Sequence, residues 1–161
     1  MQTSPHSTVV ADPLADPDLW LVYCDGSAVP NPGRMAIGAV MTAPDGARHT
    51  LSQATHSTGC NNEAELLALL AALQALKTRG ATSLRVHTDN SVLVEQLSGS
   101  GAKPILRLAG LFDDARALLL SFADARLVWV PRHRNAEADA LARAAQGLAP
   151  TRLARAKKRR R

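Results

Sequence analysis

Apolar residues along the chain follow two kinds of repeat. Short apolar runs at 19–24, 84–88 and 127–130 predict buried strands, and residues 35–42 and 48–55 predict two more strands, joined by a turn that contains Asp45-Gly46. Between 63 and 79 the apolar residues recur at helical spacing, which predicts a helix. Asn61 and Asn62 are suited to cap its start, and Gly80 its end.

Shorter helical patterns follow near residue 91, over 104–122 and over 135–146. The predicted order is three strands, a helix, a strand, helices, a strand and a last helix. This order predicts a single α/β domain over residues 19–147, with a mixed five-stranded sheet flanked by helices. Residues 1–18 contain three prolines and three aspartates without a sustained repeat, so we expect a flexible leader there.

Composition limits the class of protein. A chain of 161 residues with 46% hydrophobic residues can build one core, and no stretch approaches the ~18 apolar residues of a membrane span. We therefore expect a cytoplasmic protein without membrane contact, and a monomer. The two cysteines, Cys24 and Cys60, are too few for a disulfide framework, which predicts free thiols.

The net charge of +5 is unevenly distributed along the chain. Residues 151–161 hold seven of the 19 Lys and Arg and no acid, so that residues 1–150 carry a net charge of −2. We expect residues 148–161 to form a basic, disordered tail that contacts nucleic acid by releasing counterions. The alternative is an end that only increases solubility.

Four acidic residues lie in four separate segments, at predicted strand ends or helix starts: Asp25, Glu65, Asp89 and Asp139. Two strands that end in Asp would direct both carboxylates toward one crevice. Four carboxylates could hold two Mg²⁺ ions for phosphodiester hydrolysis, and the cations would offset their mutual repulsion. Each acid alone has an ordinary reading as a turn or cap residue, and Asp139 could pair with Arg143.

These acids lie within four longer segments. The segments are Asp25-Gly26-Ser27 with Asn31-Pro32-Gly33, then Asn61-Asn62-Glu63-Ala64-Glu65-Leu66, then His87-Thr88-Asp89-Asn90, and last Asn135-Ala136-Glu137-Ala138-Asp139-Ala140-Leu141-Ala142. In order and spacing they resemble the four signature motifs of type 1 ribonuclease H. The resemblance covers residues 19–147 and implies the ribonuclease H-like fold. It also implies an endoribonuclease that hydrolyses the RNA strand of RNA/DNA hybrids with two Mg²⁺ or Mn²⁺ ions.

The resemblance also implies roles for individual residues. Glu63 and Glu65 lie roughly 200° apart about a helix axis, so only one should face the site, and the family pattern selects Glu65. It likewise selects Asp139 over Glu137. It places Gly26, Ser27, Asn31, Asn61 and Asn62 along the substrate groove, where the 2′-hydroxyls of RNA are read. His133 resembles a histidine that assists proton transfer or product release, and Arg132 and Arg134 could contact phosphate.

One family feature is missing from the sequence. Many bacterial members carry a basic, Trp-containing protrusion that grips the DNA strand, where this chain has only Gly99-Ser100-Gly101-Ala102-Lys103-Pro104. The chain therefore resembles the branch without the protrusion, and we hypothesise that the basic tail supplies part of the missing grip. Two alternatives remain: a nuclease of the same fold that cleaves another substrate, such as double-stranded RNA, and a hybrid-binding module without catalysis.

Overall fold

The computed structural model describes residues 16–99 and 101–152, and its centre is a mixed sheet of five strands. The strands are β1 (Leu19–Val29), β2 (Gly33–Thr42), β3 (Arg48–Gly59), β4 (Ser83–Thr88) and β5 (Asp124–Trp129). They pair in the order β3-β2-β1-β4-β5, with the first three antiparallel and β1, β4 and β5 parallel. The predicted mixed sheet and α/β class are confirmed.

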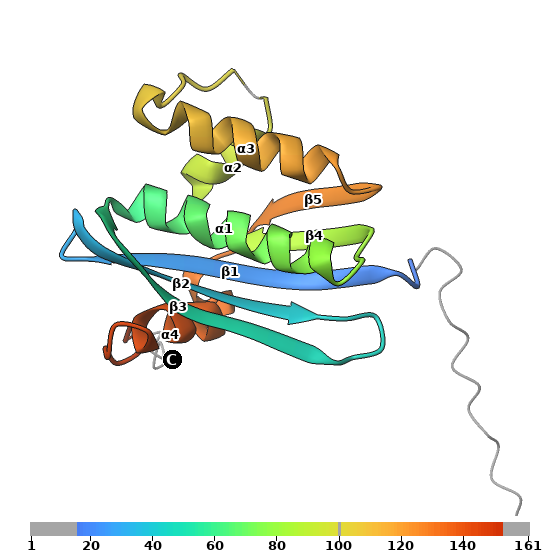
Figure 1. The fold of residues 1–161 in the computed structure, drawn as a ribbon, viewed down its shortest axis with the longest axis horizontal. Helices are drawn as coiled ribbons and strands as arrows, with labels where there is room; N and C mark the ends of the chain where they lie inside the picture. The colour runs from blue at the N-terminus through green and yellow to red at the C-terminus, as the bar shows by residue number, and fades with distance from the viewer. Residues whose placement is uncertain (1–15, 100, 153–161) are drawn as a thin grey trace, which may run out of the picture.

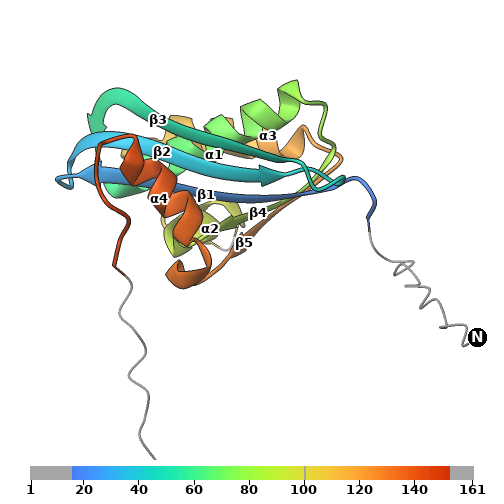
Figure 2. The same cartoon turned by 90° about the horizontal axis from the view of Figure 1, so that it is seen from below.

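Helices cover both faces of this sheet. The first, α1 (Asn61–Thr78), packs on β1 and β2, while α2 (Ser91–Leu97) and α3 (Ala109–Leu120, after a short 3₁₀ turn at Leu106–Leu108) lie against it on the same side. On the opposite face α4 (Ala136–Ala144) packs on β1, β2 and β3 (Figures 1 and 2). None of the described helices is long and apolar enough to cross a membrane.

The main core lies between the sheet and α1. Its fully buried side chains include Val22 of β1, Val86 of β4 and four leucines of α1, Leu66, Leu69, Leu73 and Leu76. Because these leucines recur at the spacing of one helical face, the repeat seen in the sequence corresponds to the face that packs on the sheet. Both cysteines are free thiols, as expected: Cys24 is buried in this core and Cys60 is half-buried.

Three local predictions were wrong. The strand 127–130 was expected to be buried, but β5 is an edge strand and Trp129 is 52% exposed. β1 does not stop at Cys24; it continues to Val29 because β2 pairs with it as far as that residue. The helix cap is Cys60 rather than an asparagine, since α1 already begins at Asn61.

The two predicted terminal segments lie largely outside the described residues. Of the leader, only residues 16–18 are described, and Asp16 there accepts a hydrogen bond from the Ser83 hydroxyl at the start of β4. Of the tail, residues 148–152 are described and 153–161 are not. The flexible leader and the disordered tail therefore stay predictions.

Candidate active site

Asp25 and Asp89 reach one crevice because of the way β1 and β4 pair. The two strands run parallel, and their last paired residues are Tyr23 and His87. Asp25 lies two residues further along β1, and Asp89 lies two residues beyond His87, directly after β4 ends. Beyond this point β1 has no partner on that side, which opens a crevice at the carboxyl end of β4.

The other two carboxylates come from the helices on opposite faces of the sheet. Each helix approaches its strand at a glycine: a Cβ at Gly26 would overlap the backbone of Ala64, and one at Gly38 would overlap that of Ala138. Without those Cβ atoms, the backbones of α1 and α4 rest directly on β1 and β2. Glu65 and Asp139 each follow such a contact by one residue, so the crevice receives one acid from each face of the sheet.

Three of the four carboxylates form a tight cluster. Asp25, Glu65 and Asp89 each offer one carboxylate oxygen, and these three oxygens all lie within 4.8 Å of one another. Burial raises the pKa of Asp25 to about 7, a hydrogen bond from Glu65 partly opposes this, and the charges of Asp89 and Asp139 add to it. Burial and the Asp25 charge together raise the pKa of Glu65 well above its usual range. Burial also raises the pKa of Asp89.

This donor set suits a hard divalent cation. Carboxylate oxygens are the ligands that Mg²⁺ and Mn²⁺ prefer, and the cluster brings three of them together. Burial and mutual repulsion raise the pKa values of Asp25 and Glu65, and a bound cation would favour the charged form of both carboxylates instead. The described residues therefore fit a metal site.

Asn135 supports this cluster, and the sequence analysis did not assign it a role. Its side chain is 1% exposed, and its Nδ2 donates to the carbonyl oxygen of Cys24 at 2.9 Å and to Oδ2 of Asp89 at 3.4 Å. It therefore connects β1 to the Asp89 carboxylate from the start of α4. Its Oδ1 is buried without a hydrogen-bond partner among the described residues. Only its place in the Asn135 to Asp139 motif could have indicated this contact.

Several of the predicted substrate residues line the same crevice as the carboxylates. Gly26, Ser27, Asn61 and Arg132 do so, and the positive charge of Arg132 lowers the pKa values of Glu65 and Asp89 against the effect of burial. Asn61 also accepts a hydrogen bond from the Ala28 N–H at 2.9 Å, which ties α1 to the end of β1. Arg132 is thus a cation at the mouth of an acidic site.

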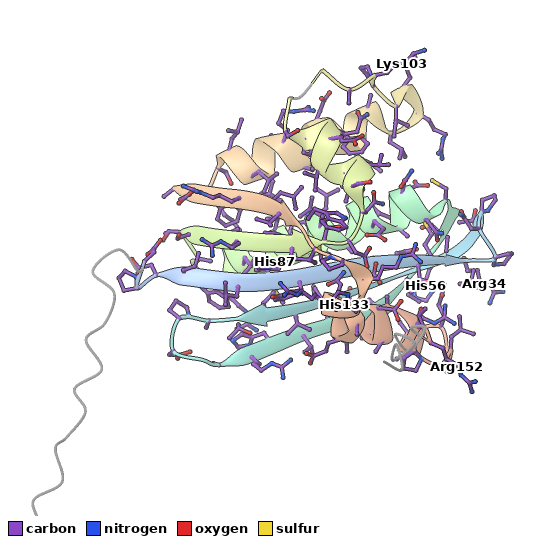
Figure 3. All side chains as sticks on the ribbon, turned by 180° about the vertical axis from the view of Figure 1, so that it is seen from behind. Arg34, His56, His87, Lys103, His133 and Arg152 are labelled. Carbon is purple, nitrogen blue, oxygen red and sulfur yellow. The ribbon has the colours of Figure 1, made fainter. Side chains whose placement is uncertain are left out.

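The remaining predicted residues lie at the margin. Asn31 accepts a hydrogen bond from the Asn61 N–H at 3.1 Å, and Asn62 accepts one from Asn90 Nδ2 at 2.9 Å. Both asparagines therefore connect segments around the start of α1. His133 (Figure 3) and Arg134 lie with Arg132 in the 3₁₀ turn Arg132–Arg134 that leads into α4. Both are exposed and do not line the crevice.

Asp139 is held by a residue for which no role was predicted. The N–H of Thr151 donates to Oδ2 at 3.0 Å and its hydroxyl to Oδ1 at 2.9 Å. The ion pair between Asp139 and Arg143 considered from the sequence does not form in the structure. Arg143 instead donates from Nε to the carbonyl oxygen of Ala149 at 2.6 Å. No signal in the sequence marked Thr151.

Comparison with known proteins gives consistent matches. Residues 23–145 match a family described as reverse transcriptase-like. The chain is 37% identical over 122 residues to a ribonuclease HI of Halobacterium salinarum (74% of this chain, 60% of the relative), and 31% identical to a ribonuclease H of Parvibaculum lavamentivorans (85% and 97%). The structure of LC11-RNase H1 in complex with an RNA/DNA hybrid superposes with a TM-score of 0.71 at 30% identity, covering 78% of this chain and 95% of that one. This chain thus spans less than two thirds of the Halobacterium relative.

Proposed function

Because the chain belongs to the type 1 ribonuclease H family, we propose that it is a metal-dependent endoribonuclease that hydrolyses the RNA strand of RNA/DNA hybrids. The observation that carries the proposal is the convergence of Asp25, Glu65, Asp89 and Asp139, from two strands and two helices, on one crevice. Of the relatives, LC11-RNase H1 was solved with an RNA/DNA hybrid bound, which supports the same class of substrate here.

The proposed chemistry assigns a role to each carboxylate. Asp25 and Asp89 would hold two Mg²⁺ or Mn²⁺ ions, and Glu65 and Asp139 would supply the remaining carboxylate ligands. Such ions, when bound, would activate the attacking water and stabilise the leaving 3′ oxygen. Asn135 holds the Asp89 carboxylate toward β1, and Glu65 is close enough to Asp25 to share a proton with it. Glu65 would also contact the 2′-hydroxyl beside the scissile bond.

Nucleic acid would reach this crevice along a surface that supplies positive charge next to the acids. Arg132 lines the crevice, and His133 and Arg134 follow it in the same exposed turn. We propose that Arg132 contacts a phosphate of the substrate, with Arg134 as a second contact and His133 assisting proton transfer or product release. Gly26, Ser27 and Asn61 would contact the RNA strand, and Asn31 and Asn62 would shape its groove.

The basic tail is a further proposed contact with nucleic acid. In Figure 3, Lys103, in the short segment that replaces the protrusion, lies at the upper edge of the molecule, and Arg152, the last described residue, lies at the lower edge. We propose that the tail contacts the hybrid on the side of α4, where Arg152 lies. The tail would add electrostatic attraction for the hybrid, but from a different place than the missing protrusion.

Cleavage of a labelled RNA/DNA hybrid by the purified protein, with Mg²⁺, with Mn²⁺ and with EDTA, tests the proposal. Cuts within the RNA strand that need metal and are lost in Asp89→Asn are expected, since the substitution keeps the shape of the side chain and removes its charge. Asp114→Asn, which makes the same change on the exposed surface of α3, should cleave like the wild type.

Two results would contradict the proposal. Full activity in Asp89→Asn would mean that this carboxylate is not part of the machinery. Tight binding of the hybrid without cleavage in either metal would instead indicate a non-catalytic binding module. Double-stranded RNA and single strands should be assayed alongside the hybrid to identify the substrate class. Preferential cleavage of double-stranded RNA would mean that it, and not the hybrid, is the substrate.

A further inference from the structure

The last described residues fold back over α4. Helix α4 ends at Ala144, and Gly147, with a positive φ of 70°, reverses the direction of the chain. Two contacts then hold the returning segment to the helix: Leu148 N–H donates to the carbonyl oxygen of Arg143 at 3.0 Å, and Arg143 Nε donates to that of Ala149 at 2.6 Å. We call residues 147–152 the C-terminal strap.

The strap reaches the first turn of α4, where it contacts Asp139. Thr151 binds both oxygens of this carboxylate, one through its N–H at 3.0 Å and one through its hydroxyl at 2.9 Å. Thr151 also lines the crevice that contains the four acids. Among the described residues that could hold a metal ion, Asp25, Glu65 and Asp89 form one group, and Asp139 is not part of it.

A cation and the two donors of Thr151 compete for the same carboxylate. The N–H and O–H hydrogens carry partial positive charge and occupy the oxygens that would face a metal ion, so a bound ion would be repelled by them. The strap also fixes the Asp139 carboxylate through both of its oxygens, while Asp139 lies outside the tight group formed by the other three acids. Leaving Thr151 therefore costs Asp139 two hydrogen bonds before it gains a cation.

We propose that the C-terminal strap is an autoinhibitory device, in which Thr151 occupies Asp139 and must release it before that carboxylate can complete the metal site. This inference rests on the proposed function, because it assumes that Asp139 is a metal ligand. The strap leads directly into the basic residues 153–161, which lie outside the described residues. The strap thus connects the segment of highest positive charge to the fourth carboxylate.

The test is the affinity of the protein for Mn²⁺ without nucleic acid, measured by calorimetry and by the electron paramagnetic resonance signal of free Mn²⁺. Thr151→Val keeps the shape and the N–H but removes the hydroxyl, and it should tighten the weaker Mn²⁺ site about threefold to tenfold, the equivalent of one exposed hydrogen bond. The gain should vanish when Asp139→Asn is added, because the carboxylate for which strap and metal compete is then gone.

Two shortened chains separate the strap from the tail. A chain that ends after Arg152 keeps Thr151 and should bind Mn²⁺ like the full chain. A chain that ends after Pro150 loses both donors and should bind more tightly than Thr151→Val. Thr151→Val and the chain ending after Pro150 could both bind Mn²⁺ as the full chain does, or more weakly, and still cleave the hybrid. That result would overturn the autoinhibitory role of the strap and leave the proposed function standing. A full chain that neither binds Mn²⁺ nor cleaves the hybrid would overturn the proposed function with it.

Discussion

Replacing Asp25 with Asn should stabilise the metal-free protein at alkaline pH. Asp25 is 6% exposed, and burial together with the charges of Asp89 and Asp139 raises its pKa to about 7. Without a cation, the fold therefore takes up a proton at Asp25 and Glu65 that an unfolded chain would have released. The asparagine has nearly the same shape and carries no charge at any pH.

The size of the effect follows from the difference between the folded and unfolded pKa values. A carboxyl group whose pKa rises from its ordinary value near 4 to about 7 contributes stability that is fully present below pH 4 and is lost as the pH rises through 7. The complete loss corresponds to about 4 kcal/mol. Between pH 5 and pH 8, we expect Asp25 to account for a loss of about 3 kcal/mol of unfolding free energy, and Glu65, whose pKa is also raised, to add to this loss.

The assay is urea unfolding of the wild type and of Asp25→Asn in EDTA at both pH values. The wild type should lose about 3 kcal/mol more than the variant between pH 5 and pH 8, because the variant has no carboxyl group at position 25 to lose a proton. Asp114→Asn on the exposed surface of α3 is the matched control and should follow the wild type. Added Mg²⁺ should restore stability at pH 8 to the wild type far more than to Asp25→Asn.

An equal loss of stability in the wild type and in Asp25→Asn would refute this reasoning. It would mean that the acidic cluster reaches its charged form without cost, by relaxing or by taking up water.

Three further changes test other parts of the structure. Asn135→Ala should lower kcat more than it raises KM, because Asp89 loses its donor, and should cost about 1–3 kcal/mol in urea unfolding; unchanged kcat would assign Asn135 to the fold alone. A chain ending after Arg152 should raise KM and flatten its salt dependence while kcat stays the same, and an unchanged KM at physiological salt would exclude a grip by the tail. Gly26→Ala should destabilise the fold or displace α1, since its Cβ would overlap the backbone of Ala64; a thermal melt and activity equal to the wild type would contradict the close approach.

The sequence was sufficient for features that depend on local repeats. Strands and helices follow from the spacing of apolar residues, and the order of those elements led to the mixed sheet. The grouping of Asp25 and Asp89 also follows, because parallel strands carry the residues after them to the same edge. Glu65 was selected over Glu63 only through the resemblance to a family, since both positions fit a helix equally well.

Features that depend on how distant segments meet could not be predicted in this way. The exposure of β5 depends on its place at the edge of the sheet, and an apolar run does not reveal strand order. The contacts of Asn135 with Cys24 and Asp89 join residues 111 and 46 positions apart. The Thr151 contact depends on the reversal of the chain at Gly147. A single glycine near the end of a helix allows such a reversal but does not predict it.

The glycine contacts under the two helices have a consequence for how this protein can change over generations. Since backbone rests on backbone at Gly26 and Gly38, the distance of α1 and α4 from the sheet at these two points is not set by a side chain. The leucines further along α1 can therefore be exchanged for other apolar residues, with a loss of stability that leaves Glu65 in place. These two glycines should therefore stay fixed while other positions of the two helices change.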